Sequence, residues 1–103
     1  MRQGTTPTLA FKIRGHDLSG AAAIVVTLRQ GTRLYNFDQD RLVVVGGDAS
    51  TILLHLTQEE TLALRVGGIA LQVRWVNPDG EAYTTDTASI SNLEALYKEV
   101  INP

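Results

Sequence analysis

Hydrophobic and polar residues alternate with period two in several short stretches of the chain. In the stretch from Thr8 to Arg14, for example, Leu9, Phe11 and Ile13 fall on one face, and the other face holds Thr8, Ala10, Lys12 and Arg14. Such alternation predicts β-strands with one face in the core. Seven strands are expected along the chain: Thr8–Arg14, Ala22–Gln30, Arg33–Phe37, Leu42–Val45, Thr51–Leu56, Ile69–Val76 and Glu81–Ile90.

The strand expected at Ile69–Val76 has the clearest pattern, and it places Trp75 on the core face. The sequence Asn-Pro-Asp-Gly follows it, and these residues suit successive positions of a type I turn. A hairpin is therefore expected at this point. Pairing across it places Trp75 opposite Tyr83 and brings Arg74 diagonal to Asp86, where an exposed salt bridge is expected.

Two segments carry helical signals. Thr57-Gln-Glu-Glu60 fits a capping box and predicts one or two helical turns near 58–65, ended by Gly67-Gly68. Asn92–Pro103 has an N-terminal asparagine and four apolar residues at helical spacing, which predicts a short terminal helix. Its apolar stripe either folds back on the domain or docks on a neighbouring subunit. The stripe is the candidate partner interface, and it consists of Leu93, Leu96, Tyr97 and Val100.

These elements predict one all-β domain spanning residues 1–103. About seven short strands separated by turn residues favour an antiparallel sandwich of the immunoglobulin-like type, although the cysteine pair that defines immunoglobulin domains is missing. A small open barrel is the alternative, because strand count does not distinguish a closed sheet from two packed sheets.

Composition and charge exclude several classes of function. The charged residues amount to 19% with a net charge of −2, and the nine basic residues are dispersed, so nucleic-acid binding is not expected. Cysteine is absent, which removes disulfides, thiolate metal sites and thiol nucleophiles. The N-terminal residues lack a signal-peptide pattern, and the longest apolar run, Ala21–Leu28, is far shorter than the roughly 20 residues of a membrane span. Neither export nor a membrane partner is expected.

The chemistry-bearing residues form no recognisable constellation. His16 in a predicted turn and His55 on a polar strand face lack sequence partners for acid–base catalysis, so both are interpreted as solvated side chains. Asp38 and Asp40 have calcium-like spacing but lack the rest of an EF-hand loop. The chain is expected to be no enzyme and to bind no metal or cofactor. An exposed Trp75 could stack on a sugar, but its apolar strand neighbours favour burial.

A resemblance to known proteins adds a functional expectation. The segments MRQGTTPTLAFKI, LSGAAAIVVTLRQG, LTQEETLALRVGGIALQVRW and DGEAYTTD resemble small proteins from prophages of Firmicutes and related gut bacteria. The block Leu56–Trp75 is the most specific part, and a similar architecture occurs in N-terminal domains of phage baseplate upper proteins.

The resemblance implies a non-enzymatic structural or accessory role in a tailed prophage, associated with the tail or baseplate. Other phage structural proteins, or copies of the same chain, would be the partners. The protein would then be made in the bacterial host cytoplasm and carried in the virion if assembled. The alternative hypothesis is an adhesion or carbohydrate-binding module.

Overall fold

A computed structural model describes residues 1–47 and 49–103. The regular elements are mostly strands, with one α-helix and two short 3₁₀ turns. In chain order they are β1 (Thr8–Arg14), η1 (Leu18–Gly20), β2 (Ala23–Gln30), β3 (Arg33–Phe37), η2 (Gln39–Arg41), β4 (Leu42–Val45), β5 (Ala49–His55), α1 (Gln58–Ala63), β6 (Gly67–Val76), β7 (Ala82–Thr84) and β8 (Ala88–Asn92).

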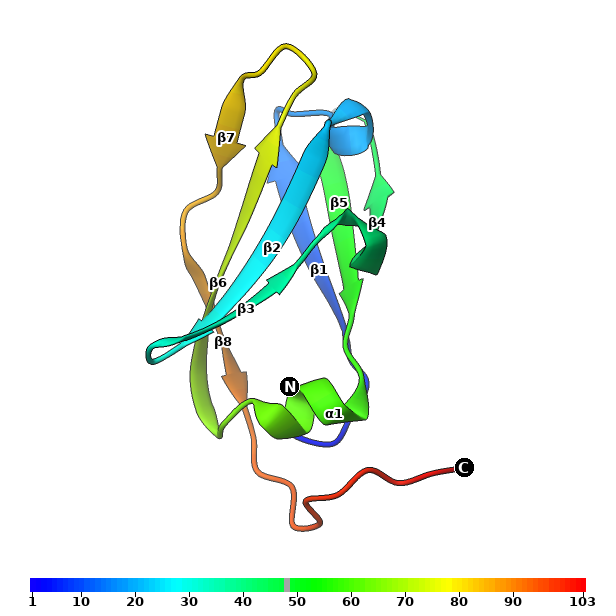
Figure 1. Ribbon diagram of the computed structural model, residues 1–103, viewed down its shortest axis with the longest axis vertical. Helices are drawn as coiled ribbons and strands as arrows, with labels where there is room; N and C mark the ends of the chain where they lie inside the picture. The colour runs from blue at the N-terminus through cyan, green and yellow to red at the C-terminus, as the bar shows by residue number, and fades with distance from the viewer. Residues whose placement is uncertain (48) are drawn as a thin grey trace.

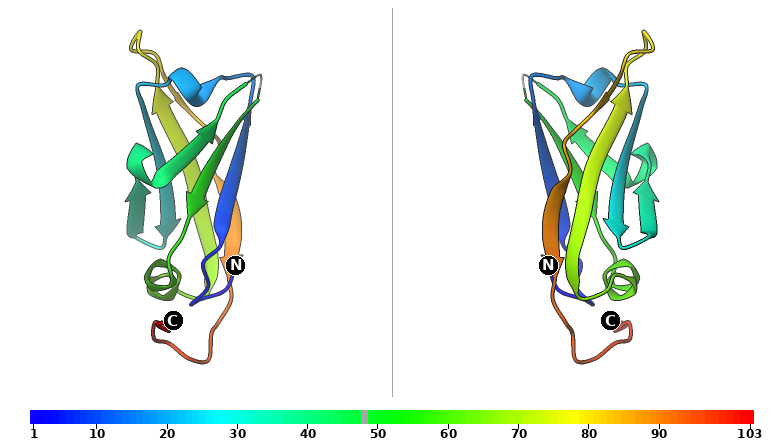
Figure 2. Two further views of the ribbon diagram at one scale, coloured as in Figure 1. Left: turned by 90° about the vertical axis from the view of Figure 1, so that its right-hand side faces the viewer. Right: turned by 90° about the vertical axis from the view of Figure 1, so that its left-hand side faces the viewer.

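The strands form two antiparallel sheets that face each other (Figure 1, Figure 2). One sheet has three strands in the order β1-β5-β4, and the other has β3-β2-β6, with β7 and β8 both pairing with β6. The helix α1 lies at one end of the molecule and the β6–β7 turn lies at the other (Figure 1). The all-β prediction is confirmed, with two packed sheets. The immunoglobulin-like subtype stays a prediction.

The core lies between the two sheets, and the alternating residues supply it. Ile52 and Leu54 of β5 are fully buried, as are Val26 and Leu28 of β2 and Ile69 of β6. Ile52, Leu54 and Ile69 lie on the faces that the alternation predicts for the core, whereas the inward face of β2 was not predicted. The strands expected at 8–14, 33–37 and 42–45 have the predicted bounds, and the others differ by one to three residues apart from the last.

The predicted β6–β7 hairpin is confirmed. The backbone N–H of Asn77 donates to the carbonyl of Glu81 at 2.8 Å, and Trp75 pairs with Tyr83 across the ladder. Trp75 is only 6% exposed, which confirms its place in the core.

The expectation of one continuous last strand is wrong. The chain forms two strands, β7 and β8, because Thr85, which lies between them, bonds to β6 partly through its side chain and so interrupts the regular backbone ladder. The Thr85 hydroxyl accepts from the Val73 N–H at 3.0 Å, and its carbonyl accepts from the Gln72 side chain at 3.1 Å. Among the described residues, the expected pair of Arg74 and Asp86 forms no salt bridge. The described residues therefore form eight strands where about seven were expected.

The capping box of α1 is confirmed: the Thr57 side chain accepts from the Glu60 N–H, and the Glu60 carboxylate accepts from the Thr57 N–H. The predicted role of Gly67-Gly68 as helix terminator is wrong. Leu64 already has extended backbone, and the two glycines begin β6. No helix in the described part of the chain is long and apolar enough to cross a membrane.

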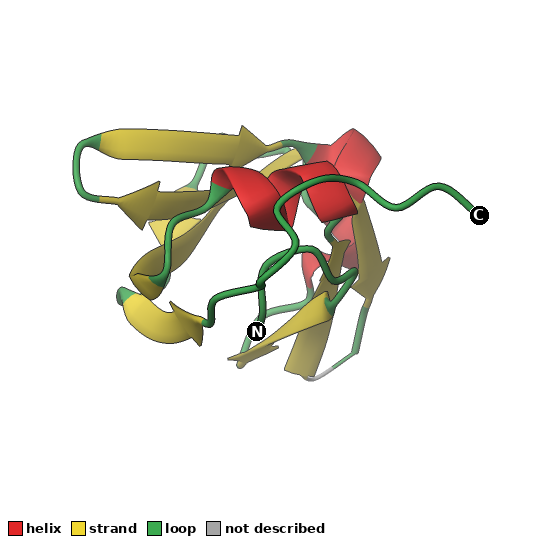
Figure 3. Ribbon diagram, turned by 90° about the horizontal axis from the view of Figure 1, so that it is seen from below, coloured by secondary structure: helices red, strands yellow, loops and turns green. Residues whose placement is uncertain are grey.

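The predicted C-terminal helix is also wrong. From Leu93 onward the described residues form irregular, extended chain that passes across α1 (Figure 1, Figure 3). Hydrogen bonds to residues distant in sequence hold this backbone: Leu93 exchanges bonds with Met1 and Gln3, and Ile101 exchanges them with the Gln58 side chain. An isolated 12-residue helix is marginal in water, so these tertiary contacts outweigh its local preference.

Candidate functional site

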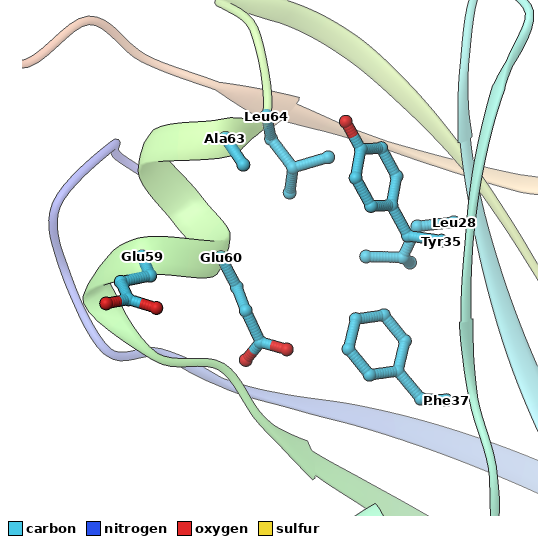
Figure 4. A pocket seen from close by; sticks show the side chains of 7 residues that line it. All are labelled: Leu28, Tyr35, Phe37, Glu59, Glu60, Ala63 and Leu64. Atoms are coloured by element: carbon cyan, nitrogen blue, oxygen red, sulfur yellow. The ribbon is translucent and has the colours of Figure 1, made fainter.

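An apolar pocket of about 280 Å³ opens between α1 and the β2–β3 hairpin (Figure 4). Its wall is made of aliphatic and aromatic side chains, with two carboxylates on the helix side (Figure 4). The lining residues are Leu28, Tyr35, Phe37, Glu59, Glu60, Ala63 and Leu64.

The strand pairing places the two rings. Leu28 of β2 pairs with Tyr35 of β3, and Phe37 lies two residues further on the same face. Both rings therefore point inward toward α1 (Figure 4). Across from them lie Ala63 and Leu64 at the end of α1. The pocket exists because the sheet and the helix do not meet closely along this line.

An ion pair between Arg41 and Glu60 lies beside the first turn of the helix. The Arg41 guanidinium donates to both carboxylate oxygens of Glu60 at 2.8 and 2.7 Å and to the His55 carbonyl at 3.0 Å. It also lies over the Phe37 ring, 5.2 Å from the centroid. The bond from Arg41 is the main cause that lowers the pKa of the Glu60 carboxyl below its ordinary value. The same bond raises the pKa of Arg41.

A second polar contact lies beyond the other end of the helix. The Gln30 side chain donates to the Arg65 carbonyl at 2.7 Å and accepts from the Arg65 N–H at 2.6 Å. It ties the end of β2 to the segment that follows Leu64. The pocket lies between the elements joined by these two contacts, so its walls are held in place without a ligand. Pre-formed apolar concavities of this kind bind apolar groups.

The predicted interface residues lie on the C-terminal segment but do not form one stripe. Leu96 is 97% exposed, Tyr97 is 60% exposed and Leu93 is 48% exposed. Val100 is half-buried and lies in a hollow beside His55 and Gln58. Extended backbone points successive side chains in different directions, which separates residues that a helix would have aligned.

Two buried amides have roles that the sequence did not predict: Gln3 was assigned none, and Asn92, expected to cap a C-terminal helix, ends β8 instead. Gln3 is buried; its side chain donates to the Leu64 carbonyl at 2.9 Å and accepts from Lys98 Nζ at 2.8 Å. Asn92 is 1% exposed, and its Nδ2 donates to the carbonyls of Thr61, Leu64 and Arg65 at the end of α1. An amide side chain gives no sign of burial in the sequence, because its donors and acceptors find partners only once distant elements pack around it.

The residues with possible catalytic or metal chemistry lie apart. His16 is half-buried, which corrects the expectation of a solvated ring: it lies 5.2 Å from the Trp75 ring and 4.9 Å from the Tyr83 ring. His55 is exposed at the end of β5 and hydrogen-bonds to Thr8.

The aspartates of the predicted turn have a structural role. Asp38 caps η2 by accepting from the Asp40 N–H at 3.2 Å. Among the residues that the structure describes, no group of three or more acidic or histidine side chains could hold a metal ion.

Comparison with known proteins adds no assignment. No family model matches the chain, and no significant match was found among curated proteins or solved structures.

Proposed function

We propose that the protein is a non-enzymatic assembly module that acts through protein–protein contacts. The resemblance noted in the sequence is the reason for placing it among the tail or baseplate proteins of a tailed prophage. The observation that carries the proposal is the C-terminal segment: its backbone is held against the domain while its large apolar side chains face solvent.

The anchoring of this segment is extensive. Gln58 pairs with both backbone groups of Ile101 at 2.9 and 2.8 Å, and Gln3 accepts from the Ala95 N–H and from Lys98. Arg2 donates to the Glu94 carbonyl at 2.7 Å. A segment held in this way loses less conformational entropy when it binds, which favours its use as a contact.

The exposed side chains supply the driving force. Leu96, Tyr97 and Ile101 are 97%, 60% and 64% exposed. Full burial of one such side chain contributes about 1.5–3 kcal/mol. Three large, exposed apolar side chains within six residues of one anchored segment favour an interaction site.

The adhesion alternative has less support. The sugar-stacking idea depended on an exposed Trp75, and this ring is 6% exposed. Tyr83, at 38%, shows part of one ring. The polar chemistry that orients a saccharide would have to come from elsewhere on the surface.

The proposal is tested on intact particles. Phage particles induced from a host that carries the gene are purified, and the protein is sought by mass spectrometry. We expect it at a fixed ratio to a known tail protein, and we expect a Leu96→Ser, Ile101→Ser double variant to be made normally but lost from the particles. Absence of the unaltered protein from every purified particle would count against the proposal.

A further inference from the structure

We propose that the apolar pocket beside α1 receives the C-terminal segment of a second copy of this chain, with Tyr97 as the side chain that enters it. The inference rests on the proposed assembly function and deepens it by naming the partner. Within one copy the pocket is open and the apolar side chains of the C-terminal segment are exposed, and the proposed contact would bury both.

The pocket has the size of a side-chain site. Its volume of about 280 Å³ lies just below the range of roughly 300–1,000 Å³ typical of small-molecule sites. Two aromatic rings, Tyr35 and Phe37, form one wall. Aromatic side chains prefer to pack against other rings in tilted or offset geometry. A single bulky side chain, and best an aromatic one, suits this space.

Tyr97 is the side chain of the segment that matches these walls. Its ring is 60% exposed, and its hydroxyl donates only a long bond of 3.4 Å to Glu99. Tyrosine is enriched at the centres of protein interfaces because its ring is apolar while its hydroxyl bonds at the rim. Glu59 is an exposed residue of the pocket lining, and its carboxylate can accept a hydrogen bond from the hydroxyl.

The charges on α1 and on the C-terminal segment of a second copy complement each other when the two run in opposite directions. Carboxylates stand at the start of α1, where Glu59 is exposed, and Arg65 is exposed just beyond the end of the helix. The segment carries Glu94 before Tyr97 and Lys98 directly after it, and within one copy these two side chains form an exposed ion pair at 3.5 Å. Because such an exposed pair is weak, a segment running opposite to α1 can exchange it for contacts of Lys98 with Glu59 and of Glu94 with Arg65. Such pairs favour this orientation more than they add affinity.

The position of the two features permits a reciprocal contact. Gln58 holds the C-terminal segment, and the next residues of the same helix line the pocket. Figure 3 shows the segment crossing α1. The C-terminal segment and the pocket therefore lie beside the same helix. A two-fold axis near α1 would let each copy insert its Tyr97 into the pocket of the other. A symmetric contact of this kind closes as a dimer.

Sedimentation equilibrium with pocket and segment variants tests the proposal. Ala63→Phe fills the pocket from an exposed position of the helix, and Ala82→Phe is the matched control on β7. We expect Ala63→Phe and Tyr97→Ala each to weaken the dimer by about tenfold or more, and Ala82→Phe to leave it unchanged. Circular dichroism confirms that each variant is folded.

The outcomes separate the two proposals. A dimer that Ala63→Phe does not weaken overturns the pocket assignment, as does a protein that stays monomeric at concentrations of about 1 mM. Neither result bears on the assembly function, because the particle experiment tests that function without requiring self-association. Incorporation into particles together with strict monomers would mean that the segment binds a different protein.

Cross-linking gives a second, independent measurement. The chain has no cysteine, so single cysteines can be introduced without competition. Mixing Ala63→Cys with Tyr97→Cys under mild oxidation should give a mixed disulfide between two copies far faster than mixing Ala82→Cys with Tyr97→Cys. In the mixed pair the copy with Ala63→Cys keeps its own Tyr97, so one of the two reciprocal contacts still holds the copies together. Equal rates for the two mixtures would show that Tyr97 does not approach the pocket.

Discussion

The indole ring of Trp75 stacks on the phenol ring of Tyr83, with 5.5 Å between the centroids and 20° between the planes. The two residues are direct partners across the β6–β7 ladder. Tyr83 is 38% exposed and Trp75 only 6%, so the tyrosine covers the tryptophan at the end of the molecule remote from α1.

Removing the covering ring should weaken the fold modestly. We expect Tyr83→Ala to lower the free energy of unfolding by about 1 kcal/mol, since it loses the aromatic stack and part of its buried area. Emission from Trp75, the single tryptophan, should shift to longer wavelength as water reaches the indole. Urea titration followed by fluorescence measures both effects. Tyr97→Ala, studied in dilute solution, is the control and should change neither.

The buried amide of Asn92 should be the most sensitive polar position. Its Nδ2 donates to three carbonyls at 3.1–3.3 Å. Asn92→Asp removes these donors and places a carboxylate against carbonyl oxygens, so we expect a loss of about 3 kcal/mol or more at neutral pH. Protonation of the new carboxyl should restore part of the stability in acid. Thermal unfolding at two pH values checks this, and exposed Asn36→Asp should stay within about 0.5 kcal/mol.

The Arg41–Glu60 pair should make stability depend on pH. The pKa of Glu60 lies below its ordinary value of 4.5 in the folded protein, chiefly because of the bonds from Arg41. The pair therefore stabilises the fold fully above that ordinary value, and its contribution is lost as the pH falls through the lowered pKa.

Substituting the carboxyl isolates this contribution. We expect Glu60→Gln to cost about 0.5–1 kcal/mol near pH 7, because the pair is only partly buried, and to cost progressively less as the pH falls below 4.5. Urea denaturation between neutral and acid pH gives the profile. Glu59→Gln is the control, because it changes an exposed carboxylate of the same helical turn. Its difference in unfolding free energy from the unaltered protein should not shrink in the same way as the pH falls. A pH-independent difference for Glu60→Gln would contradict the assignment.

The backbone of Gly46 lies so close to the side chains of Asp17 and Ser19 that an added methyl group would clash with them. A Cβ at this position would lie 2.6 Å from Asp17 Oδ1 and 2.7 Å from Ser19 Cβ. Asp17 is itself held by bonds from the Ser19 N–H and hydroxyl, so it cannot move away freely. We expect Gly46→Ala to cost about 1–3 kcal/mol. Gly20→Ala, where a Cβ meets no atom within 4 Å, should be neutral or slightly stabilising in the same unfolding assay.

Local sequence patterns were sufficient to predict several of the individual elements. The bounds of β1, the capping box at Thr57 and Glu60, and the pairing of Trp75 with Tyr83 were all predicted and are confirmed. Each of these features depends on residues close together in the chain or joined by a tight turn. Side-chain period and turn chemistry are sufficient for them.

Contacts between distant parts of the chain set the interruption at Thr85, the course of the C-terminal segment and the pocket beside α1. The C-terminal stripe predicted from helical spacing is not formed, because Gln3 and Gln58 bind that backbone from 43 or more positions away. The pocket likewise needs side chains from β2, β3 and α1 together. Buried carbonyls must find donors, and which distant amide reaches them depends on how the sheets and the helix pack.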